Sequence, residues 1–405
     1  MQTQLTEEFR LRPEGREAEG ILRRCVHCGF CNATCPTYRV LGDELDGPRG
    51  RIYLIKEMLE GAPVTARTRQ HLDRCLTCRA CETTCPSGVR YGRLLDLGRA
   101  ELERRAPRAL PARLLRRALI AGLSHRRGFA ALLALGRALR PWLPAALRRR
   151  IPEARRAGAW PPPRQARRML VLQGCVQPAL APSINAAAAR VLDRAGVSLI
   201  AAADGCCGAL AQHLGDPERA RAHMRRNIDA WWPQIERGVE AIVVTASGCG
   251  VQVKDYGELL ADDPRYADKA RRVSALFLEL SEAVGREHER LRFSAAPGPR
   301  VAFHAPCTLT HGLRLGGTIE RMLRDSGCEL TPVADAQRCC GSAGTYSILE
   351  PRLAGRLRAD KLRALQAGAP EVIATANIGC LTHLAAGSER PVRHWIEVLE
   401  ARLAE

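Results

Sequence analysis

The sequence is poor in features that mark several common classes of protein. Aromatic residues make up only 4% of it, and no stacking or helix-turn-helix pattern accompanies its many arginines, so we expect no nucleic acid as a partner. No run of 18 apolar residues occurs, so no segment is expected to span a bilayer. A charged-then-apolar leader is missing, and 17 cysteines, an odd number, fit a secreted disulfide scaffold poorly. These features predict a cytoplasmic protein whose cysteines bind metal.

Patterns for chemistry on a substrate are missing as well. The sequence has no G-x-G-x-x-G fingerprint for a dinucleotide, and neither a Ser-His set nor a pair of carboxylates stands out. We therefore expect partner chains to carry out any such chemistry.

Cysteine is abundant, and eight cysteines form two copies of one motif. Residues 25–36 and 75–86 both read C-x2-C-x2-C-x3-C-P. With this spacing a compact turn presents three thiolates to one [4Fe-4S] cube, while the fourth cysteine points to the cube of the other copy. Buried or zinc-binding cysteines are the alternative, but zinc sites usually pair two C-x-x-C knuckles without the trailing Cys-Pro. The motifs predict two [4Fe-4S] clusters.

The segment around these motifs is predicted to be a small helical, ferredoxin-like domain over residues 1–100. Apolar residues recur at helical spacing over residues 51–60, between the motifs, and over residues 91–105, after them.

Residues 101–166 are predicted to form a basic helical linker. From residue 101 to residue 168 the chain has eighteen Arg, no Lys and three Glu, a local net charge of +15. Its leucines recur at helical spacing between prolines, and two interpretations stay open. In the first, the helix lies on anionic lipid at the inner face of the cytoplasmic membrane. In the second, it packs its leucines against the ferredoxin-like domain or a partner subunit.

The rest of the chain contains an internal repeat, which predicts two domains over residues 167–295 and 296–405. Each half shows three short apolar runs with helical stretches between them, a β-α-β-α-β order that favours a mostly parallel sheet covered by helices. The predicted strands are residues 169–172, 197–201 and 241–245, and residues 301–303, 328–333 and 372–375. The predicted fold class is therefore α+β or α/β: a helical two-cluster module, a basic linker and two α/β domains.

Four cysteines recur at matched positions of the two halves, at offsets of 131 to 133 residues. They are Cys175, Cys206, Cys207 and Cys249 in the first half, and Cys307, Cys339, Cys340 and Cys380 in the second. They lie just past the predicted carboxyl ends of strands, the edge at which parallel sheets bind ligands. We expect an additional metal or redox site there; small buried cysteines in tight turns are the alternative.

Two ferredoxin-type motifs followed by two Cys-Cys-Gly domains resemble the iron-sulfur electron-transfer subunits of the heterodisulfide reductase, anaerobic glycerol-3-phosphate dehydrogenase and glycolate oxidase group. Within this group, six segments look like the glycolate oxidase iron-sulfur subunits. They are Cys25–Cys31, Gly42–Lys56, Leu72–Cys78, Ala230–Pro233, Thr375–Cys380 and Val392–Ile396.

The resemblance implies a crosswise set of cluster ligands. Cys25, Cys28 and Cys31 would bind one cluster together with Cys85, and Cys75, Cys78 and Cys81 would bind the other together with Cys35. Related heterodisulfide reductase domains hold an unusual cluster with five cysteines, but one of those positions is Ala246 here in the first half and Asn377 in the second. Each half then offers four cysteines, for a four-thiolate cluster or as a structural relic that binds partner subunits. His304, His311 and His383 are candidate extra ligands of the second half.

The implied function is an electron relay. Two FAD-binding subunits would oxidise glycolate to glyoxylate, and this chain would pass the electrons on to a quinone or another acceptor. Alternatives are the equivalent subunit for glycerol 3-phosphate or another 2-hydroxy acid, and a catalytic subunit similar to heterodisulfide reductase.

Overall fold

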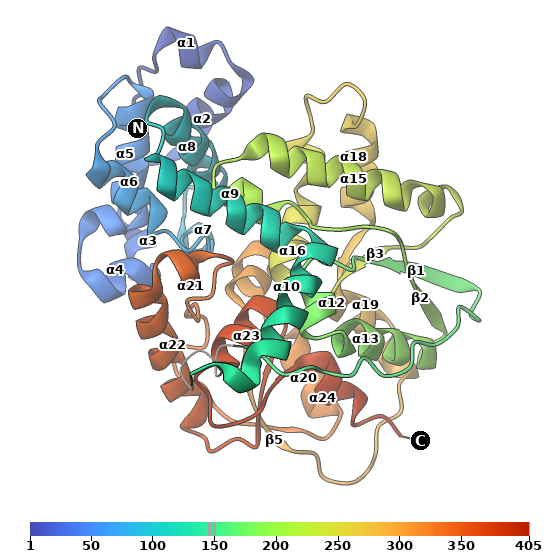
Figure 1. Cartoon of the computed structure of the whole chain (residues 1–405). Coiled ribbons are helices and arrows are strands. Elements are labelled where there is room, and N and C mark those ends of the chain that lie inside the picture. The colour runs from blue at the N-terminus through green and yellow to red at the C-terminus, as the bar shows by residue number, and fades with distance from the viewer. Residues whose placement is uncertain (145–147, 149–150, 405) are drawn as a thin grey trace.

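The computed structural model describes the chain except for residues 145–147, 149–150 and 405. In Figure 1 the N-terminal helical module (blue) lies at the upper left, the first repeat (green to yellow) on the right and the second repeat (orange to red) below. The predicted fold class is confirmed, because a helical module precedes two parallel sheets with their helices.

The N-terminal module consists of short helices around one apolar core. Its elements are α1 (Glu7–Arg10), α2 (Pro13–Arg24), α3 (Phe30–Ala33), α4 (Pro36–Leu41), η1 (Glu44–Asp46), α5 (Pro48–Leu59), α6 (Ala66–Asp73), α7 (Ala80–Thr84) and α8 (Tyr91–Arg105). Leu22 of α2, Ile55 of α5 and Leu94 of α8 are fully buried in the core. Helices α5 and α8 therefore lie where the apolar spacing predicts them.

The basic linker forms two helices that cross the front of the molecule in Figure 1. They are α9 (Leu110–Ser124) and α10 (Arg126–Leu139), and the one-turn helix η2 (Arg140–Trp142) follows. Ile120 of α9 packs into a core of the first repeat, whereas α10 buries none of its residues. In the part of the chain that the structure describes, no helix combines the length and the apolarity that crossing a bilayer requires.

The first repeat is a four-stranded parallel sheet in the order β2-β1-β3-β4. Its elements are β1 (Arg167–Val171), α12 (Gln177–Leu180), α13 (Ser183–Arg194), β2 (Val197–Ala201), α14 (Ala209–His213), α15 (Pro217–Glu236), β3 (Ile242–Val244), α16 (Ser247–Lys254), α17 (Tyr256–Leu259), α18 (Ala267–Leu276), β4 (Phe277–Glu279), α19 (Leu280–Arg286) and η3 (His288–Arg290).

Both faces of this sheet are covered, because successive side chains of a strand point to opposite faces. Met169 and Val171 of β1 pack into a core with α13 and α19. Leu170 and the following Leu172 pack into a second core with α15 and α18. This explains why the strand is apolar without alternation.

The second repeat has the same topology, in the order β6-β5-β7-β8. Its elements are β5 (Arg300–His304), the π-helix η4 (Thr308–Leu313), α20 (Thr318–Asp325), β6 (Glu329–Leu330), α21 (Tyr346–Leu349), α22 (Pro351–Gln366), β7 (Val372–Thr375), α23 (Ile378–Ala385), β8 (Val392–His394) and α24 (Trp395–Glu400).

Each sheet contains a fourth strand that the sequence did not predict. Strands β4 and β8 are three residues long, and a helix follows each of them directly. Both strands lie at the edge of their sheet and run directly into a helix, so they do not stand out as separate apolar runs and are defined by the pairing with the neighbouring strand.

The two repeats share one apolar core and meet near the carboxyl ends of their strands. The amide of Ser247 donates to the carbonyl of Ala376 at 3.3 Å. The Nε2 atom of His394 lies 3.0 Å from the carbonyl oxygen of Thr245. These contacts hold the loops with the repeat cysteines close to each other.

A buried carboxyl group in the first repeat gives the fold a pH dependence. Glu279 is fully buried at the end of β4, where one carboxyl oxygen accepts the amide of Ser281 at 2.6 Å. The other oxygen has no partner in the described residues. Burial, only partly offset by the bonds from Ser281, raises the pKa of Glu279 from 4.5 to about 7.

We therefore expect Glu279→Gln to change how stability depends on pH. Because the native carboxyl binds a proton more tightly than the unfolded one, its contribution to the free energy of unfolding falls as the pH rises from 4.5 to 7. Gln keeps an acceptor for Ser281 and does not titrate. Urea unfolding of both proteins should show the wild type losing up to about 3 kcal/mol relative to the variant over this range. Parallel curves would contradict the prediction.

Candidate iron-sulfur sites

The structure brings Cys25, Cys28 and Cys31 of the first motif together with Cys85 of the second. Helix α3, which contains Cys31, packs against α7, which Cys85 follows directly. Burial and the nearby thiols of Cys25, Cys28 and Cys85 raise the pKa of Cys31 to about 11. All four cysteines line one cavity, which Cys81 of the second motif also lines. This grouping supports the predicted crosswise set of ligands.

The second group is Cys75, Cys78 and Cys81 together with Cys35 of the first motif. Burial, followed by the thiols of Cys78, Cys75 and Cys35, raises the pKa of Cys81 well above its ordinary value. Cys78 and Cys81 are buried, whereas Cys28, the middle cysteine of the first motif, is exposed. One group therefore lies at the surface of the module and the other in its interior.

Both motifs turn through left-handed backbone at the same two positions. His27 and Gly29 have φ angles of 59° and 87° in the first motif, and Thr77 and Arg79 have 52° and 58° in the second. Side chains other than glycine adopt this region at a cost, least readily a β-branched one such as Thr77. We attribute the shared turn to the need to aim three thiols at one point.

A buried arginine lies beside the second group. Arg51 of α5 has no solvent exposure, and its Nη1 atom lies 3.9 Å from the Sγ atom of Cys35. Its guanidinium is 3.3 Å from the carboxylate of Asp46, which also pairs with Arg74 at 2.9 Å. Its Nε atom donates to the carbonyl of His71 at 2.7 Å.

Asp46 pairs with both arginines, and the guanidinium of Arg51 is the positive charge that lies next to Cys35. A buried charge needs a partner of the opposite sign. A cluster bound by four thiolates is anionic, and the buried guanidinium of Arg51 beside Cys35 fits it. The donor sets and their surroundings thus suit two iron-sulfur clusters. The cysteine spacing gave no indication of Arg51, although it lies within the family-like segment Gly42–Lys56.

In the first repeat the four predicted cysteines form one group. The thiol of Cys207 interacts with those of Cys206 and Cys249, and the thiol of Cys206 interacts with that of Cys175. Gly208, which follows them, has a φ of 95°, and a Cβ atom there would lie 2.9 Å from the carbonyl oxygen of Ala220. Only glycine therefore fits this position without strain.

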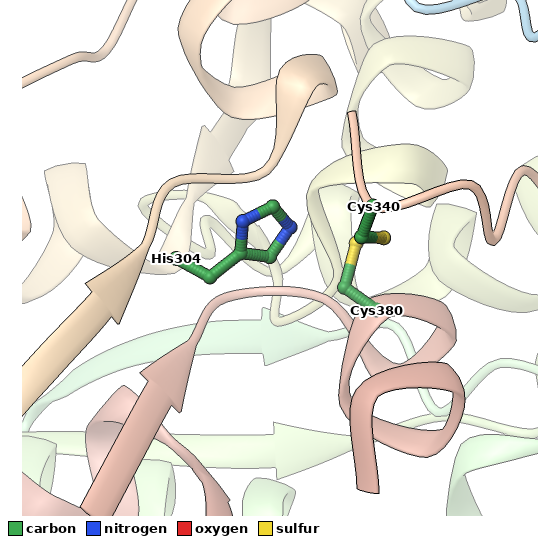
Figure 2. Close-up of side chains that lie close together, drawn as sticks. All are labelled: His304, Cys340 and Cys380. Atoms are coloured by element: carbon green, nitrogen blue, oxygen red, sulfur yellow. The ribbon is translucent and has the colours of Figure 1, made fainter. Parts of the chain in front are cut away.

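The second repeat also brings its cysteines together, and it adds a histidine. The Sγ atoms of Cys307 and Cys339 are 3.8 Å apart, and the thiol of Cys340 interacts with those of Cys339 and Cys380. Figure 2 shows the ring of His304, at the end of β5, pointing toward Cys340 and Cys380. Burial, together with the nearby Lys361, holds the pKa of His304 well below its usual value.

The other two candidate histidines have different surroundings. His311 lies with its Nδ1 atom 2.9 Å from the hydroxyl of Thr83, and His383 lies with its Nε2 atom 3.3 Å from the carbonyl oxygen of Ala354. The three histidines were equivalent by sequence, and the structure places His304 in the group of thiols.

The second repeat lies directly against the second ferredoxin-type group. Cys78 packs in one apolar cluster with Cys339 and Cys307. Burial and the thiol of Cys307 raise the pKa of Cys78 well above its ordinary value.

The helical module contains two crosswise groups of four cysteines, and two parallel-sheet domains with cysteines at their strand ends follow it. This arrangement defines an iron-sulfur protein of the dicluster class with cysteine-rich domains. In agreement, the 4Fe-4S dicluster domain family matches residues 21–89, and the cysteine-rich domain family matches residues 169–254 and 301–385. The chain belongs to the family of glycolate oxidase iron-sulfur subunits.

Two curated relatives establish this membership. The chain is 55% identical to the glycolate oxidase iron-sulfur subunit of Escherichia coli K12 over 405 residues, which cover 100% of this chain and 99% of the relative. It is 30% identical to the probable glycolate oxidase iron-sulfur subunit of Bacillus subtilis 168, over 96% of this chain and 93% of that protein.

A solved structure shares the fold alone. A hypothetical protein from Helicobacter pylori superposes with a TM-score of 0.55 at 11% identity, over 97% of this chain and 73% of that one.

Proposed function

We propose that this chain is the electron-relaying subunit of a glycolate-oxidising complex. It receives electrons from FAD-binding partner subunits, which oxidise glycolate to glyoxylate, and passes them to a quinone or another acceptor. Iron-sulfur clusters exchange one electron at a time, which suits them to carry singly the two electrons that a flavin takes from a substrate.

The observation that carries this proposal is the pair of crosswise cysteine groups at the contact of α3 with α7. We propose Cys25, Cys28, Cys31 and Cys85 as ligands of one [4Fe-4S] cluster. Cys35, Cys75, Cys78 and Cys81 are the proposed ligands of the other. The four cysteines of the first repeat are proposed to bind a further iron-sulfur group.

The surface around Cys28 fits the docking of a flavin subunit. Val26 and Phe30, which flank the exposed Cys28, are 67% and 62% exposed. Tyr53, whose ring centroid lies 6.1 Å from that of His27, is also exposed. Contiguous exposed apolar side chains mark protein contacts. Electrons would enter here, at the group of cysteines nearest the surface, and continue to the buried group.

The repeats give no support to a catalytic subunit similar to heterodisulfide reductase. Ala246 and Asn377 occupy the positions at which such domains carry the first cysteine of their final pair. Neither side chain is a thiolate ligand.

Iron and acid-labile sulfide, counted per chain after anaerobic purification, test the cluster assignment. We expect about eight of each from the two ferredoxin-type groups, and any iron above eight should disappear in Cys207→Ser. A chain that binds zinc at the eight cysteines and no iron would contradict the proposal.

We further propose that α10 makes a peripheral contact with the membrane that holds the acceptor. Leu132, Leu135 and Leu139 lie on one side of this helix and are all exposed, and Trp142 just beyond it is 79% exposed. Arginines surround this stripe in a segment of net charge +15. An exposed apolar stripe among positive charges is typical of helices that lie on anionic lipid.

Sedimentation with lipid vesicles tests this contact. We expect the chain to sediment with vesicles that contain phosphatidylglycerol and to remain in solution with pure phosphatidylcholine, because each arginine near an anionic surface contributes about 1 kcal/mol. The double variant Leu132→Glu and Leu135→Glu should no longer sediment with the vesicles. The control is Ile348→Glu, which changes an exposed residue outside the linker. Equal sedimentation of both variants would contradict the contact.

A further inference from the structure

Three metal-binding side chains meet in the second repeat. The nitrogen of His304 and the Sγ atoms of Cys340 and Cys380 lie within 4.8 Å of one another. They come from the end of β5, the loop before α21 and helix α23, and all three are buried (Figure 2). Residues from three separate segments of the chain therefore form one buried site.

The imidazole of His304 lacks any other partner. It is 1% exposed, and neither ring nitrogen makes a hydrogen bond within the part of the chain that the structure describes. Leaving a buried polar group without a partner costs about 1–3 kcal/mol. A ligand bound between the ring and the two thiols would remove this cost.

The spacing of the three atoms fits a single ion. A tetrahedral ion with bonds of roughly 2.0–2.3 Å holds its ligand atoms roughly 3.3–3.8 Å apart, so small side-chain rotations suffice to close the site. A cube binds each thiolate to a different iron and keeps the thiolates farther apart. Among the described residues, no three of the eight ferredoxin-type cysteines lie within this 4.8 Å limit.

We propose that the second repeat binds one zinc ion through His304, Cys340 and Cys380, and that Cys339 supplies the fourth ligand. The donor set of three thiolates and one imidazole is common for closed, structural zinc sites. The three thiols give up their protons on binding. This site is distinct from the proposed relay, because zinc takes up no electrons.

The first repeat cannot form the same site. Its residue at the position of His304, three residues before the first repeat cysteine, is Leu172, which is buried in an apolar core. The two repeats therefore differ in their donors, although their cysteines match. A zinc ion in the second repeat would tie β5, the Cys-Cys loop and α23 together beside Cys78 of the buried ferredoxin-type group.

One other trio of ligand atoms lies equally close in the described residues, and two cationic side chains already contact it. It consists of Asp43, Asp46 and His71. The carboxylate of Asp46 pairs with Arg51 and Arg74. The carboxylate of Asp43 accepts the amide of Leu45, and the two guanidinium groups at Asp46 would repel a further cation.

Zinc content and zinc K-edge X-ray absorption of the full chain test the proposal. We expect one zinc per chain in protein purified anaerobically from zinc-supplied cells, in addition to its iron. Its shell should contain sulfur at roughly 2.3 Å and nitrogen at roughly 2.0–2.1 Å. A chain without bound zinc, or a shell of sulfur alone, would overturn the proposal.

Substitutions at position 304 identify the nitrogen ligand. His304→Leu, which reproduces the residue of the first repeat, should lose the zinc and keep the iron. His304→Cys should keep one zinc and change its shell to sulfur alone, which remains informative if the Leu variant folds poorly. His383→Leu is the matched control and should keep both metals. If His304→Leu keeps its zinc with an unchanged ligand shell, the assignment of His304 is refuted. The iron count of the same samples separately tests the clusters of the proposed relay.

Discussion

Serine at Cys78 is expected to abolish reduction of the acceptor by the assembled complex, while glycolate still reduces the flavin of the partner subunit. The serine hydroxyl replaces a buried thiolate ligand in the interior group of cysteines, so the path beyond the flavin is interrupted. Turnover should fall by more than about 100-fold, since changes that touch only outer-shell partners already cost 10–100-fold. Steady-state acceptor reduction and single-turnover flavin bleaching measure the two steps separately.

Cys28→Ser should give the same result at the surface group, because both groups are needed in a linear path. Cys328→Ser is the matched control, since Cys328 is buried in the second repeat, outside the four groups of cysteines, and lies 3.5 Å from the hydroxyl of Ser326. The control should turn over normally. Normal turnover in Cys28→Ser or Cys78→Ser would refute the relay through these cysteines.

Arg51→Leu should be among the most destabilising single substitutions in the helical module. It removes a fully buried guanidinium and leaves Asp46 buried with Arg74 as its charged partner. Breaking one side of a buried ion pair costs about 3–5 kcal/mol. We also expect the iron content to fall, because the positive charge beside Cys35 is lost. Urea unfolding and iron counts on the same samples measure both effects.

Arg49→Leu, two residues earlier on α5, provides the comparison. Arg49 forms an ion pair of 2.6 Å with Glu44 at the surface, where both side chains are more than one-third exposed. Surface ion pairs contribute about 0–1 kcal/mol, so this variant should unfold close to the wild type. Equal losses in the two variants would show that burial of Arg51 is not the cause. Arg51→Lys should be intermediate, because lysine keeps the charge and lacks the planar fork that reaches Thr37 and Asp46.

Apolar runs in the sequence predict most strands of the two repeats, but not the fourth strand of either sheet. The strands β1, β2, β3, β5 and β7 lie where apolar runs predict them. Strand β6 covers only Glu329–Leu330 of the predicted residues 328–333, and β4 and β8 were missed. In a two-sided sheet the central strands are apolar along their whole length and stand out. A three-residue strand at the edge is defined by its pairing, which a local pattern does not contain.

The sequence by itself determined the motifs, the repeat, the fold class and the family, because these depend on spacing along the chain. A C-x2-C-x2-C turn is local, and its cysteines converge whatever surrounds them. Beyond the cluster ligands that the resemblance implies, the tertiary structure alone decided which distant side chains lie together: Arg51 with Cys35, and His304 rather than His311 with the thiols of the second repeat. These contacts come from the packing of separate helices and strands. Side chains that look equivalent in the sequence differ in their contacts only because the fold gives each its own burial and its own neighbours.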